Sequence, residues 1–356
     1  MFVAATTLAF AVGCASGNNA TNENASENGG AASENAASEG EAAGENAAGS
    51  DKVYKVGISQ IVEHPSLDAT REGFLAGLKD GGLVDGENLE VSYSNAQGDM
   101  TTNTTIAQNF KAGGMDLVLG IATPSAIALA EQITDKPVIF TAVTDPIGSG
   151  LVADAAKPGA NVTGISDTHP EEIQKLMEFI ATQFPNVKTI GTVINEGEQN
   201  SVVSIERAQA ALDAHGIKIE KAAVTNSSEV QQAAESLVGR VDAIYIPKDN
   251  TVVSAFEAVV GVANDNKIPL FAGDIDSVKR GAFATYGYQY YDIGYTTGKL
   301  AADILLNGKN PGDIPVGYPE QLDLYFSEAA AAAQGIEVTQ AIRDLIVDEE
   351  KHIVKQ

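Results

Sequence analysis

The chain lacks tryptophan and has a single cysteine, Cys14, among its 356 residues. One cysteine excludes a disulfide within the chain. Basic side chains are few as well: 22 Lys and Arg stand against 48 Asp and Glu, which gives a formal net charge of −26. Binding to nucleic acid depends on many contacts between basic side chains and phosphates, so this charge argues against a nucleic-acid partner.

Motifs of common enzyme and metal sites are also missing. The sequence contains no Gly-x-Ser-x-Gly motif, and its four histidines are too scattered to suggest a metal site. Gly148–Ala153 fits a loose dinucleotide-binding pattern, but an Asp-Pro pair separates it from the preceding strand and Pro158 interrupts the segment after it. We therefore expect no enzyme activity, no cofactor and no metal ion.

The first fifty residues differ in composition from the rest. Residues 1–14 read MFVAATTLAFAVGC, an apolar run that is too short to span a bilayer and that ends at Cys14. Residues 15–50 are almost only Gly, Ala, Ser, Asn and Glu, which predicts a disordered acidic tether because so little apolar surface can be buried. The start resembles a bacterial lipoprotein signal. That resemblance implies that Cys14 is lipidated and anchors an extracytoplasmic protein to the membrane.

From residue 51 on, short β-branched runs alternate with segments that carry apolar residues at helical spacing. This alternation is typical of parallel sheets covered by helices on both faces. Strand candidates lie at 54–61, 89–94, 116–121, 137–143, 187–195, 217–224, 243–247, 269–273 and 282–287. So many strand–helix units are too many for a single sheet. The sequence therefore predicts an α/β fold with two Rossmann-like lobes and parallel sheets.

The two series of units also predict where the chain is divided. The first series ends near Gly164, the second near Gly287, and a helical segment and a strand-like segment follow. We expect crossings between the lobes near Gly164, Gly287 and Leu324, which would form a three-strand hinge. The predicted lobes are 51–164 with 288–323, and 165–287 with 324–345; residues 346–356 are expected to form a C-terminal tail.

Polar side chains recur where the predicted strands end, which is the edge at which open parallel sheets bind ligands. Hydroxyl or amide groups occur there at Ser66, Thr123, Ser125, Asn200, Ser201, Asn250 and Thr251. Carboxylates occur at Asp68, Asp145, Glu198, Asp249 and Asp274. Each residue alone is a common helix cap. Together, helix starts suit a carboxylate and acidic groups suit an ammonium, so the set favours a zwitterion such as an amino acid.

Three parts of this prediction are specific. Asp145 and Asp274 are the leading partners for the ligand ammonium, because a buried ammonium needs a charged partner. In LGIATPSAIALA, residues 119–130, Thr123 is expected to cap a helix and Ser125 to face the cleft and bind the ligand carboxylate. In ATYGYQYYD, the tyrosines at 286, 288, 290 and 291 crowd the second crossing, where they either join the core or stack on a flat ligand.

Several segments resemble, in order, the ABC-transporter substrate-binding proteins associated with tryptophan and tyrosine uptake. They read KVGISQIVEHPSLDATREGFLAGL, GIATPSAIALA, FTAVTDPIGSGLV, GANVTGIS, VINEGEQNS and YIPKDNTV, and the similarity covers roughly residues 53–340. The resemblance implies a type I periplasmic-binding-protein fold that closes on an aromatic amino acid and delivers it to a membrane permease.

The resemblance also implies ligand contacts in both lobes. Those of the first lobe would be His64, Ser66, Leu67, Asp68, Thr123, Ser125 and Asp145. Those of the second would be Glu198, Asn200, Ser201, Asp249, Asn250, Asp274 and a tyrosine of the second crossing, Tyr286 or Tyr288. We expect a monomer. A ligand-sensing receptor, an enzyme on the same scaffold, and a sugar or nucleoside as ligand remain alternatives.

Overall fold

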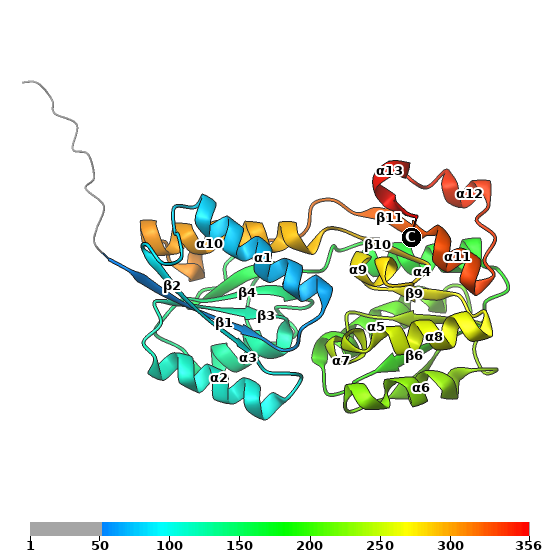
Figure 1. Ribbon diagram of the computed structural model, residues 1–356, viewed down its shortest axis with the longest axis horizontal. Helices are drawn as coiled ribbons and strands as arrows, with labels where there is room; N and C mark the ends of the chain where they lie inside the picture. The colour runs from blue at the N-terminus through cyan, green and yellow to red at the C-terminus, as the bar shows by residue number, and fades with distance from the viewer. Residues whose placement is uncertain (1–51, 356) are drawn as a thin grey trace, which may run out of the picture. The chain divides into compact units, whose positions relative to one another are not determined.

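A computed structural model describes residues 52–355 of the chain (Figure 1). The predicted lipoprotein-like segment with Cys14 and the predicted tether lie outside these residues. The described part is an α/β structure with two mainly parallel sheets, which confirms the predicted fold class.

The first sheet contains five parallel strands in the order β2-β1-β3-β4-β5. Its strands are β1 (Tyr54–Gln60), β2 (Leu89–Asn95), β3 (Leu117–Ile121), β4 (Val138–Val143) and β5 (Val162–Ser166). Helices α1 (Pro65–Asp80) and α10 (Tyr290–Asn307) cover one face, and α2 (Met100–Ala112) and α3 (Thr123–Gln132) cover the other (Figure 1). Every residue of β3, β4 and β5 is buried, as expected for a parallel sheet with both faces covered.

The second sheet has the order β12-β11-β10-β9-β8-β6-β7. Its strands are β6 (Thr189–Ile194), β7 (Lys218–Ala223), β8 (Ala243–Ile246), β9 (Leu270–Ala272), β10 (Ala284–Gly287), β11 (Asp323–Ser327) and β12 (Ile353–Val354). Its helices are α4 (Glu172–Gln183), α5 (Gln199–Asp213), α6 (Val230–Leu237), α7 (Asn250–Ser254), α8 (Phe256–Asn266), α9 (Ile275–Lys279), α11 (Glu328–Gln334), α12 (Gln340–Arg343) and α13 (Glu349–His352).

Alternate residues of β8 show that this sheet, too, is covered on both faces. Ala243 and Tyr245 belong to one apolar cluster, with α4 and α5, whereas Ile244 and Ile246 belong to another, with α6 and α8. Side chains alternate between the faces of a strand, so the two clusters lie on opposite sides.

Three features of the sheets differ from the sequence-based expectations. The strand β5, VTGIS, is absent from the predicted set, because its glycine and hydroxyl residues weaken the apolar pattern. The pair β10–β11 is antiparallel, so the second sheet is not wholly parallel. Residues 346–356 are not a separate tail, since Ile353 and Val354 pair with Phe326 and Ser327 of β11.

The chain passes between the two sheets three times: after β5, after β10 and before β11 (Figure 1). The predicted crossing points Gly164, Gly287 and Leu324 fall within β5, β10 and β11, so the connecting segments begin or end next to them. Short segments that join two lobes in this way are the usual place for hinge motion.

Helices α1 and α10 approach each other unusually closely. A Cβ atom added at Gly77 would overlap the carbonyl oxygen of Tyr295, and one added at Gly298 would overlap that of Phe74. Gly73 and Gly294 face the partner backbone in the same way. The two helices therefore pack backbone against backbone, which only glycine allows at these positions.

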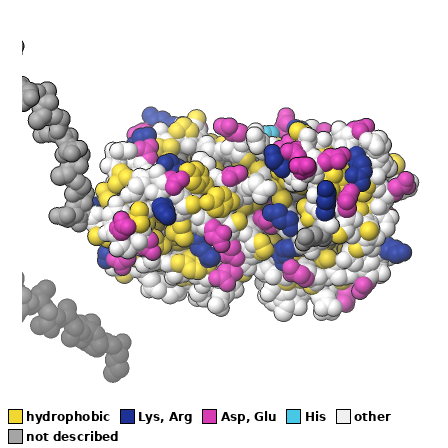
Figure 2. Space-filling view, turned by 45° about the horizontal axis from the view of Figure 1, so that its top comes forward, with side chains coloured by type: hydrophobic (Ala, Val, Ile, Leu, Met, Phe, Trp, Pro, Cys, Tyr) yellow, Lys and Arg dark blue, Asp and Glu magenta, His cyan; other side chains and the backbone are white. Residues whose placement is uncertain are grey.

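The surface offers no large patch of one charge on the face shown in Figure 2, where acidic and basic side chains are interspersed over both lobes. Within residues 52–355, no helix combines the length and the apolar character that a membrane crossing needs.

Candidate functional site

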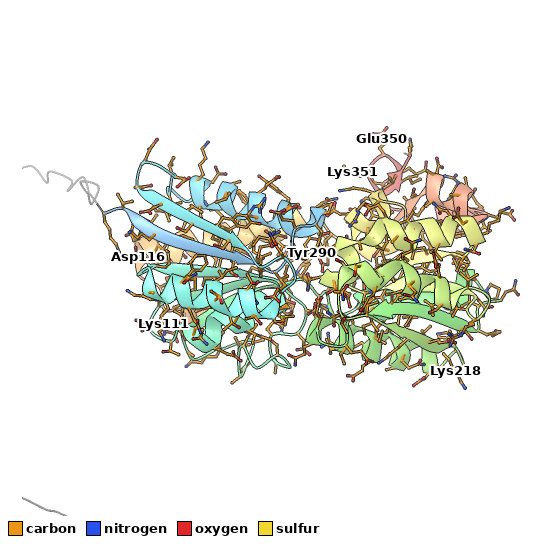
Figure 3. All side chains as sticks on the ribbon, turned by 60° about the horizontal axis from the view of Figure 1, so that its bottom comes forward. Lys111, Asp116, Lys218, Tyr290, Glu350 and Lys351 are labelled. Atoms are coloured by element: carbon orange, nitrogen blue, oxygen red, sulfur yellow. The ribbon has the colours of Figure 1, made fainter. Side chains whose placement is uncertain are left out.

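A small enclosed cavity lies where the two lobes meet, with a volume of about 20 Å³. The first lobe and its connecting segment contribute His64, Ser66, Leu67, Ala142, Thr144, Asp167 and Tyr290. The second lobe contributes Asn200, Lys248, Asn250, Val253 and Asp274. Tyr290 is labelled in Figure 3, between the two sheets. The volume suits about one water molecule, so the lobes are closed on each other.

A direct hydrogen bond crosses this cavity. The Ser66 hydroxyl, in the first turn of α1, donates to Asp274 Oδ1 over 2.9 Å. Asp274 is the N-cap of α9 and also accepts from the Ser277 backbone N–H at 2.8 Å and from its hydroxyl at 2.7 Å. Both Ser66 and Asp274 are almost fully buried. The cavity thus holds a carboxylate that is paired only with neutral donors.

A second buried carboxylate, Asp167, follows β5. Its oxygens accept hydrogen bonds from the Thr144 hydroxyl at 3.1 Å and from the Tyr290 hydroxyl at 2.8 Å. Asp167 is 3% exposed. Like Asp274, it carries no basic partner on its carboxylate in the described part of the chain. An ammonium group would complement either carboxylate.

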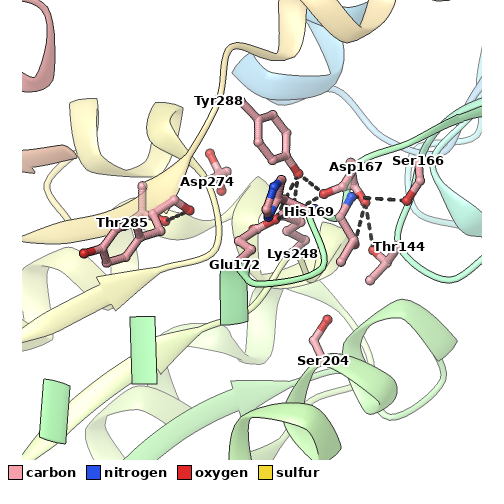
Figure 4. A network of polar contacts seen from close by, with 12 residues as sticks. Thr144, Ser166, Asp167, His169, Glu172, Ser204, Lys248, Asp274, Thr285 and Tyr288 are labelled. Atoms are coloured by element: carbon pink, nitrogen blue, oxygen red, sulfur yellow. Dashed lines mark hydrogen bonds and ion pairs between the residues drawn. The ribbon is translucent and has the colours of Figure 1, made fainter. Parts of the chain in front are cut away.

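Lys248, after β8, is the one Lys or Arg among the lining residues. Its ammonium group forms an ion pair with Glu172 at 2.6 Å, lies 2.6 Å from the Tyr288 hydroxyl and also bonds to the Asp167 carbonyl oxygen (Figure 4). Burial raises the pKa of Glu172 to about 7, although attraction to Lys248 opposes this. The cavity therefore combines acidic groups with one cation.

Within residues 52–355, two polar atoms of lining residues are buried without a hydrogen-bond partner: His64 Nδ1 and Asn200 Oδ1. Burial also lowers the pKa of His64, and the nearby Asp274 opposes this only in part. The imidazole is accordingly neutral at pH 7. Unpartnered buried polar atoms are rare in folded proteins, and at an interlobe cavity they are candidates for ligand contacts.

The structure brings some of the predicted site residues to this cavity and leaves others outside it. Those at the cavity are His64, Ser66, Leu67, Asn200, Asn250 and Asp274. Those outside it are Asp68, Thr123, Ser125, Asp145, Glu198, Ser201, Asp249, Tyr286 and Tyr288.

Ser125 and Thr123 do not occupy the positions expected in the 119–130 segment. Ser125 is fully buried inside the first lobe, where its hydroxyl donates to Asn103 Oδ1 at 3.1 Å. Thr123 is the first residue of α3 and not its cap; Ala122, with φ of 73°, precedes the helix. The positive φ of Ala122 turns the chain at that point, which shifts the helix start by one residue.

Asp145 lies outside the cavity, where it pairs across the lobes with Arg207 at 2.9 Å. Asp68 accepts from the Gln60 amide at 2.9 Å and lies 3.5 Å from Arg71, all within the first lobe. Both acidic groups therefore have basic partners already, which makes them poor candidates to receive an ammonium.

Glu198, Ser201 and Asp249 do not line this cavity, although Glu198 lines a neighbouring cavity of about 90 Å³ between the lobes. Glu198 accepts from the backbone N–H groups of Asn250 and Thr251 at the start of α7, at 3.1 and 2.9 Å. Asp249 caps the same helix through the Val252 N–H at 2.9 Å. Burial and the neighbouring Glu198 raise the pKa of Asp249 to about 8.

The two candidate tyrosines belong to the lobes and not to the cavity. Tyr286 packs edge-on against Phe179 in the second-lobe core, with 6.4 Å between ring centres. Tyr288 packs in the first-lobe core and directs its hydroxyl to Lys248 and Glu172.

Sequence reasoning missed Ala142, Thr144, Asp167, Lys248 and Val253, and it named Tyr290 only as one of four clustered tyrosines. Thr144 and Lys248 each directly precede an acidic residue of the predicted set, and Tyr290 stands in the tyrosine cluster. Their strand-end positions are therefore the signal that could have found them. Asp167 carries no such signal, because the strand before it is absent from the predicted set.

Comparison with known proteins places this geometry in a family. Residues 55–348 match the family model described as ABC transporter substrate binding protein. A tyrosine-binding protein of Clostridioides difficile is 39% identical over 323 residues, which cover 90% of this chain and 87% of the relative.

Two solved structures are similar as well. The ABC domain from Streptococcus pneumonia in complex with L-Trp is 35% identical, with a TM-score of 0.79 over 85% of this chain and 100% of that one. A ligand-free, open structure of a substrate-binding protein with adhesive properties from Clostridium difficile is 39% identical, with a TM-score of 0.62 over 85% and 98%. The lower score with the open structure, despite its higher identity, agrees with the small cavity: the lobes here are closed.

Proposed function

The chain belongs to the family of ABC transporter substrate-binding proteins, and we propose that it binds an aromatic amino acid between its lobes and delivers it to an importer's permease. Members of this family are binding proteins that work outside the cytoplasm, not enzymes. The observation that carries the proposal is the charge arrangement of the interlobe cavity, where two carboxylates lie near one cation. A zwitterion presents the complementary pair of charges.

The ammonium of the ligand would pair with Asp274 and Asp167. In the closed protein these carboxylates accept hydrogen bonds from the hydroxyls of Ser66 and Tyr290. The hydroxyls are neutral donors, whereas an ammonium adds the attraction of its positive charge to each carboxylate, so an ammonium would displace the hydroxyls.

The ligand carboxylate would pair with Lys248. Its ammonium group is held by the Glu172 carboxylate and by the Tyr288 hydroxyl, so it is directed toward the meeting point of the lobes. A second anion next to the buried ammonium of Lys248 is favoured because the pKa of Glu172 is raised to about 7. At pH 7 the Glu172 carboxylate therefore neutralises the Lys248 charge only in part.

The side chain of the ligand would contact Leu67, Val253 and the ring of Tyr290, which supply the apolar part of the wall. An aromatic side chain is supported by two relatives, the tyrosine-binding protein and the domain solved with L-Trp. Ligand pockets usually measure about 300 Å³ or more, so the lobes have to separate at the connecting segments before an amino acid enters the cavity of about 20 Å³.

A fluorescence titration tests the proposal directly. The chain contains no tryptophan, so excitation at the red edge of the indole band reports only on added L-Trp. We expect saturable enhancement of L-Trp emission, which L-Tyr reverses by competition and which a sugar or a nucleoside leaves unchanged. Absence of binding by L-Trp, L-Tyr and L-Phe, measured by calorimetry in the same buffer, would contradict the proposal.

We also propose that Cys14 carries the lipid that holds the protein at the outer surface of the membrane. The support is the lipoprotein-like sequence that ends at this cysteine. In cells that express the full chain, Cys14→Ser is expected to move the protein from the membrane fraction to the soluble fraction. Unchanged membrane association would rule out this anchor.

A further inference from the structure

Glu198 is buried next to the cavity and contacts two asparagines that line it. Its Oε2 accepts from Asn200 Nδ2 at 3.1 Å, from Asn250 Nδ2 at 2.6 Å and from the Asn250 backbone N–H at 3.1 Å. Glu198 is 2% exposed and does not itself reach the cavity, whereas Asn200 and Asn250 both do.

These contacts determine which way the Asn200 amide is turned. Its Nδ2 faces two acceptors, Glu198 Oε2 and the Lys248 carbonyl oxygen at 2.8 Å. The reversed amide would place Oδ1 against a carboxylate and a carbonyl, which repel it, and would leave both acceptors without a donor. The Asn200 carbonyl oxygen is therefore directed away from Glu198, toward the face of the lobe that Asn200 lines.

Asn200 Oδ1 is buried and has no partner within the described residues. A buried acceptor without a donor is unfavourable and is satisfied when a ligand supplies an N–H or O–H. The same wall carries Asp274, another acceptor. An ammonium group, with three N–H donors, can satisfy both at once.

We propose that Glu198 is a positioning residue: it turns the Asn200 carbonyl oxygen toward the ligand, so that the second lobe selects ligands that carry an ammonium group. This inference rests on the proposed function, because it concerns the same site. Glu198 and Asp274 thus have different roles: Glu198 acts through Asn200, whereas Asp274 would touch the ligand.

Glu198→Gln is the first test, since it keeps the size of the side chain but removes its charge and replaces one of its two accepting oxygens by a donating NH2 group. L-Trp and its des-amino analogue, indole-3-propionate, are titrated in parallel. We expect the ratio of their affinities to fall roughly 10- to 100-fold, the scale of one hydrogen bond to a charged group. The affinity for indole-3-propionate, which has no ammonium, is expected to stay within about twofold of its wild-type value.

Thr251→Val is the matched control. Thr251 donates to the other carboxylate oxygen of Glu198, Oε1, through its hydroxyl at 2.7 Å, and it does not line the cavity. The substitution removes a bond to Glu198 but leaves both asparagine amides in place. We expect a lower melting temperature and an unchanged ratio of affinities.

Asn200→Ala tests whether the effect passes through the asparagine. Asn200→Ala is expected to lower the ratio of the affinities for L-Trp and indole-3-propionate. The double variant with Glu198→Gln is expected to differ from Asn200→Ala by less than about twofold in this ratio, because coupled residues do not act additively. If Glu198→Gln does not fold, Asn200→Ala decides alone: an unchanged ratio overturns the inference.

The outcomes separate this inference from the proposed function. Wild-type protein that binds neither L-Trp nor L-Tyr contradicts the proposed function and the positioning role with it. Wild-type protein that binds L-Trp, together with a Glu198→Gln variant that loses both ligands equally, contradicts only the positioning role. Additive effects of Glu198→Gln and Asn200→Ala contradict it as well.

Discussion

Ser66 Oγ, at the start of α1, lies 2.9 Å from Asp274 Oδ1, at the start of α9, and this hydrogen bond joins the two lobes inside the cavity. The hydroxyl occupies the acceptor that a ligand ammonium would need. In the closed protein, a neutral hydroxyl thus makes a weaker form of the contact that we propose for the ligand ammonium. A charged donor can replace the hydroxyl at little cost, because Asp274 keeps its other bonds to Ser277.

Asp274→Asn is expected to weaken binding of L-Trp roughly 10- to 100-fold, because the ammonium loses its charged acceptor. Asparagine is also a good N-cap, so the melting temperature should change little. The fluorescence titration measures the first quantity and circular dichroism the second. Asp99→Asn is the control, since Asp99 caps α2 through the Thr102 N–H and does not line the cavity. Equal affinities of the two variants for L-Trp would show that Asp274 does not contact the ligand.

Ser125→Ala is expected to lower stability and leave ligand affinity unchanged. The Ser125 hydroxyl donates to Asn103 Oδ1, which also accepts from Ser59, so its loss weakens a buried polar cluster of the first lobe. The free energy of unfolding should fall by about 1 kcal/mol in urea titrations. A large loss of affinity without a loss of stability would instead support the sequence-based assignment of Ser125 to the ligand.

Arg207→Gln is expected to weaken ligand binding up to about fivefold at low salt, since Arg207 and Asp145 form an ion pair between the lobes at 2.9 Å. The pair is partly exposed, so the difference from wild type should shrink as salt is raised. Stopped-flow dissociation of L-Trp at two salt concentrations measures it. Lys279→Gln, which breaks the Lys279–Asp276 pair within the second lobe, is the control. A salt-independent difference would argue against an electrostatic role.

His64 is expected to make the protein less stable as the pH falls below 6.5. Burial lowers the pKa of His64 in the folded protein, so below pH 6.5 the unfolded chain binds a proton that the folded one does not. His64→Gln should therefore lose less stability in this range than wild type, as measured by urea unfolding. Glu172 and Asp249, whose pKa values are raised to about 7 and about 8, act with the opposite sign. Both are present in wild type and variant, so their contributions cancel in the difference. If the free energy of unfolding depends on pH equally in both proteins, His64 does not contribute to this pH dependence.

Gly77→Ala is expected to destabilise the protein by about 2 kcal/mol or more, because the new methyl group would overlap the Tyr295 carbonyl oxygen of α10. Gly261→Ala provides the matched comparison. Gly261 is an exposed residue of α8, and a Cβ there meets nothing within 4 Å, so alanine should stabilise by about 0.5–1 kcal/mol through helix propensity. Thermal unfolding of the two variants should shift in opposite directions; a shared direction would contradict the close packing.

The alternation of apolar runs with helical segments was enough to predict the fold class, because the central strands of a covered parallel sheet are buried apolar runs. The pattern fails where a strand is short and polar. In β5, Gly164 lies against the Phe140 backbone, so a small residue replaces the apolar one that would have identified the strand. The two-residue strand β12 is set by its pairing with β11, which no local pattern records.

The candidate site was only partly predictable, because a strand-end position does not fix the direction of a side chain. Asp145 and Thr144 are neighbours in sequence, yet Thr144 lines the cavity and Asp145 reaches Arg207 in the other lobe. Lys248 and Asp249 differ in the same way: Lys248 lines the cavity, whereas Asp249 caps α7. Capping and ligand contact use the same residue types, so only the three-dimensional arrangement separates them.

The close packing of α1 and α10 has a consequence for the order in which a ligand would meet the two lobes. Ser66 lies in the first turn of α1 and Tyr290 begins α10, so both side chains belong to a pair of helices that cannot slide past each other without backbone overlap. The first-lobe half of the cavity therefore keeps its shape when the lobes part. The proposed amino acid would therefore bind first to this preformed half of the cavity, and the second lobe would then close over it.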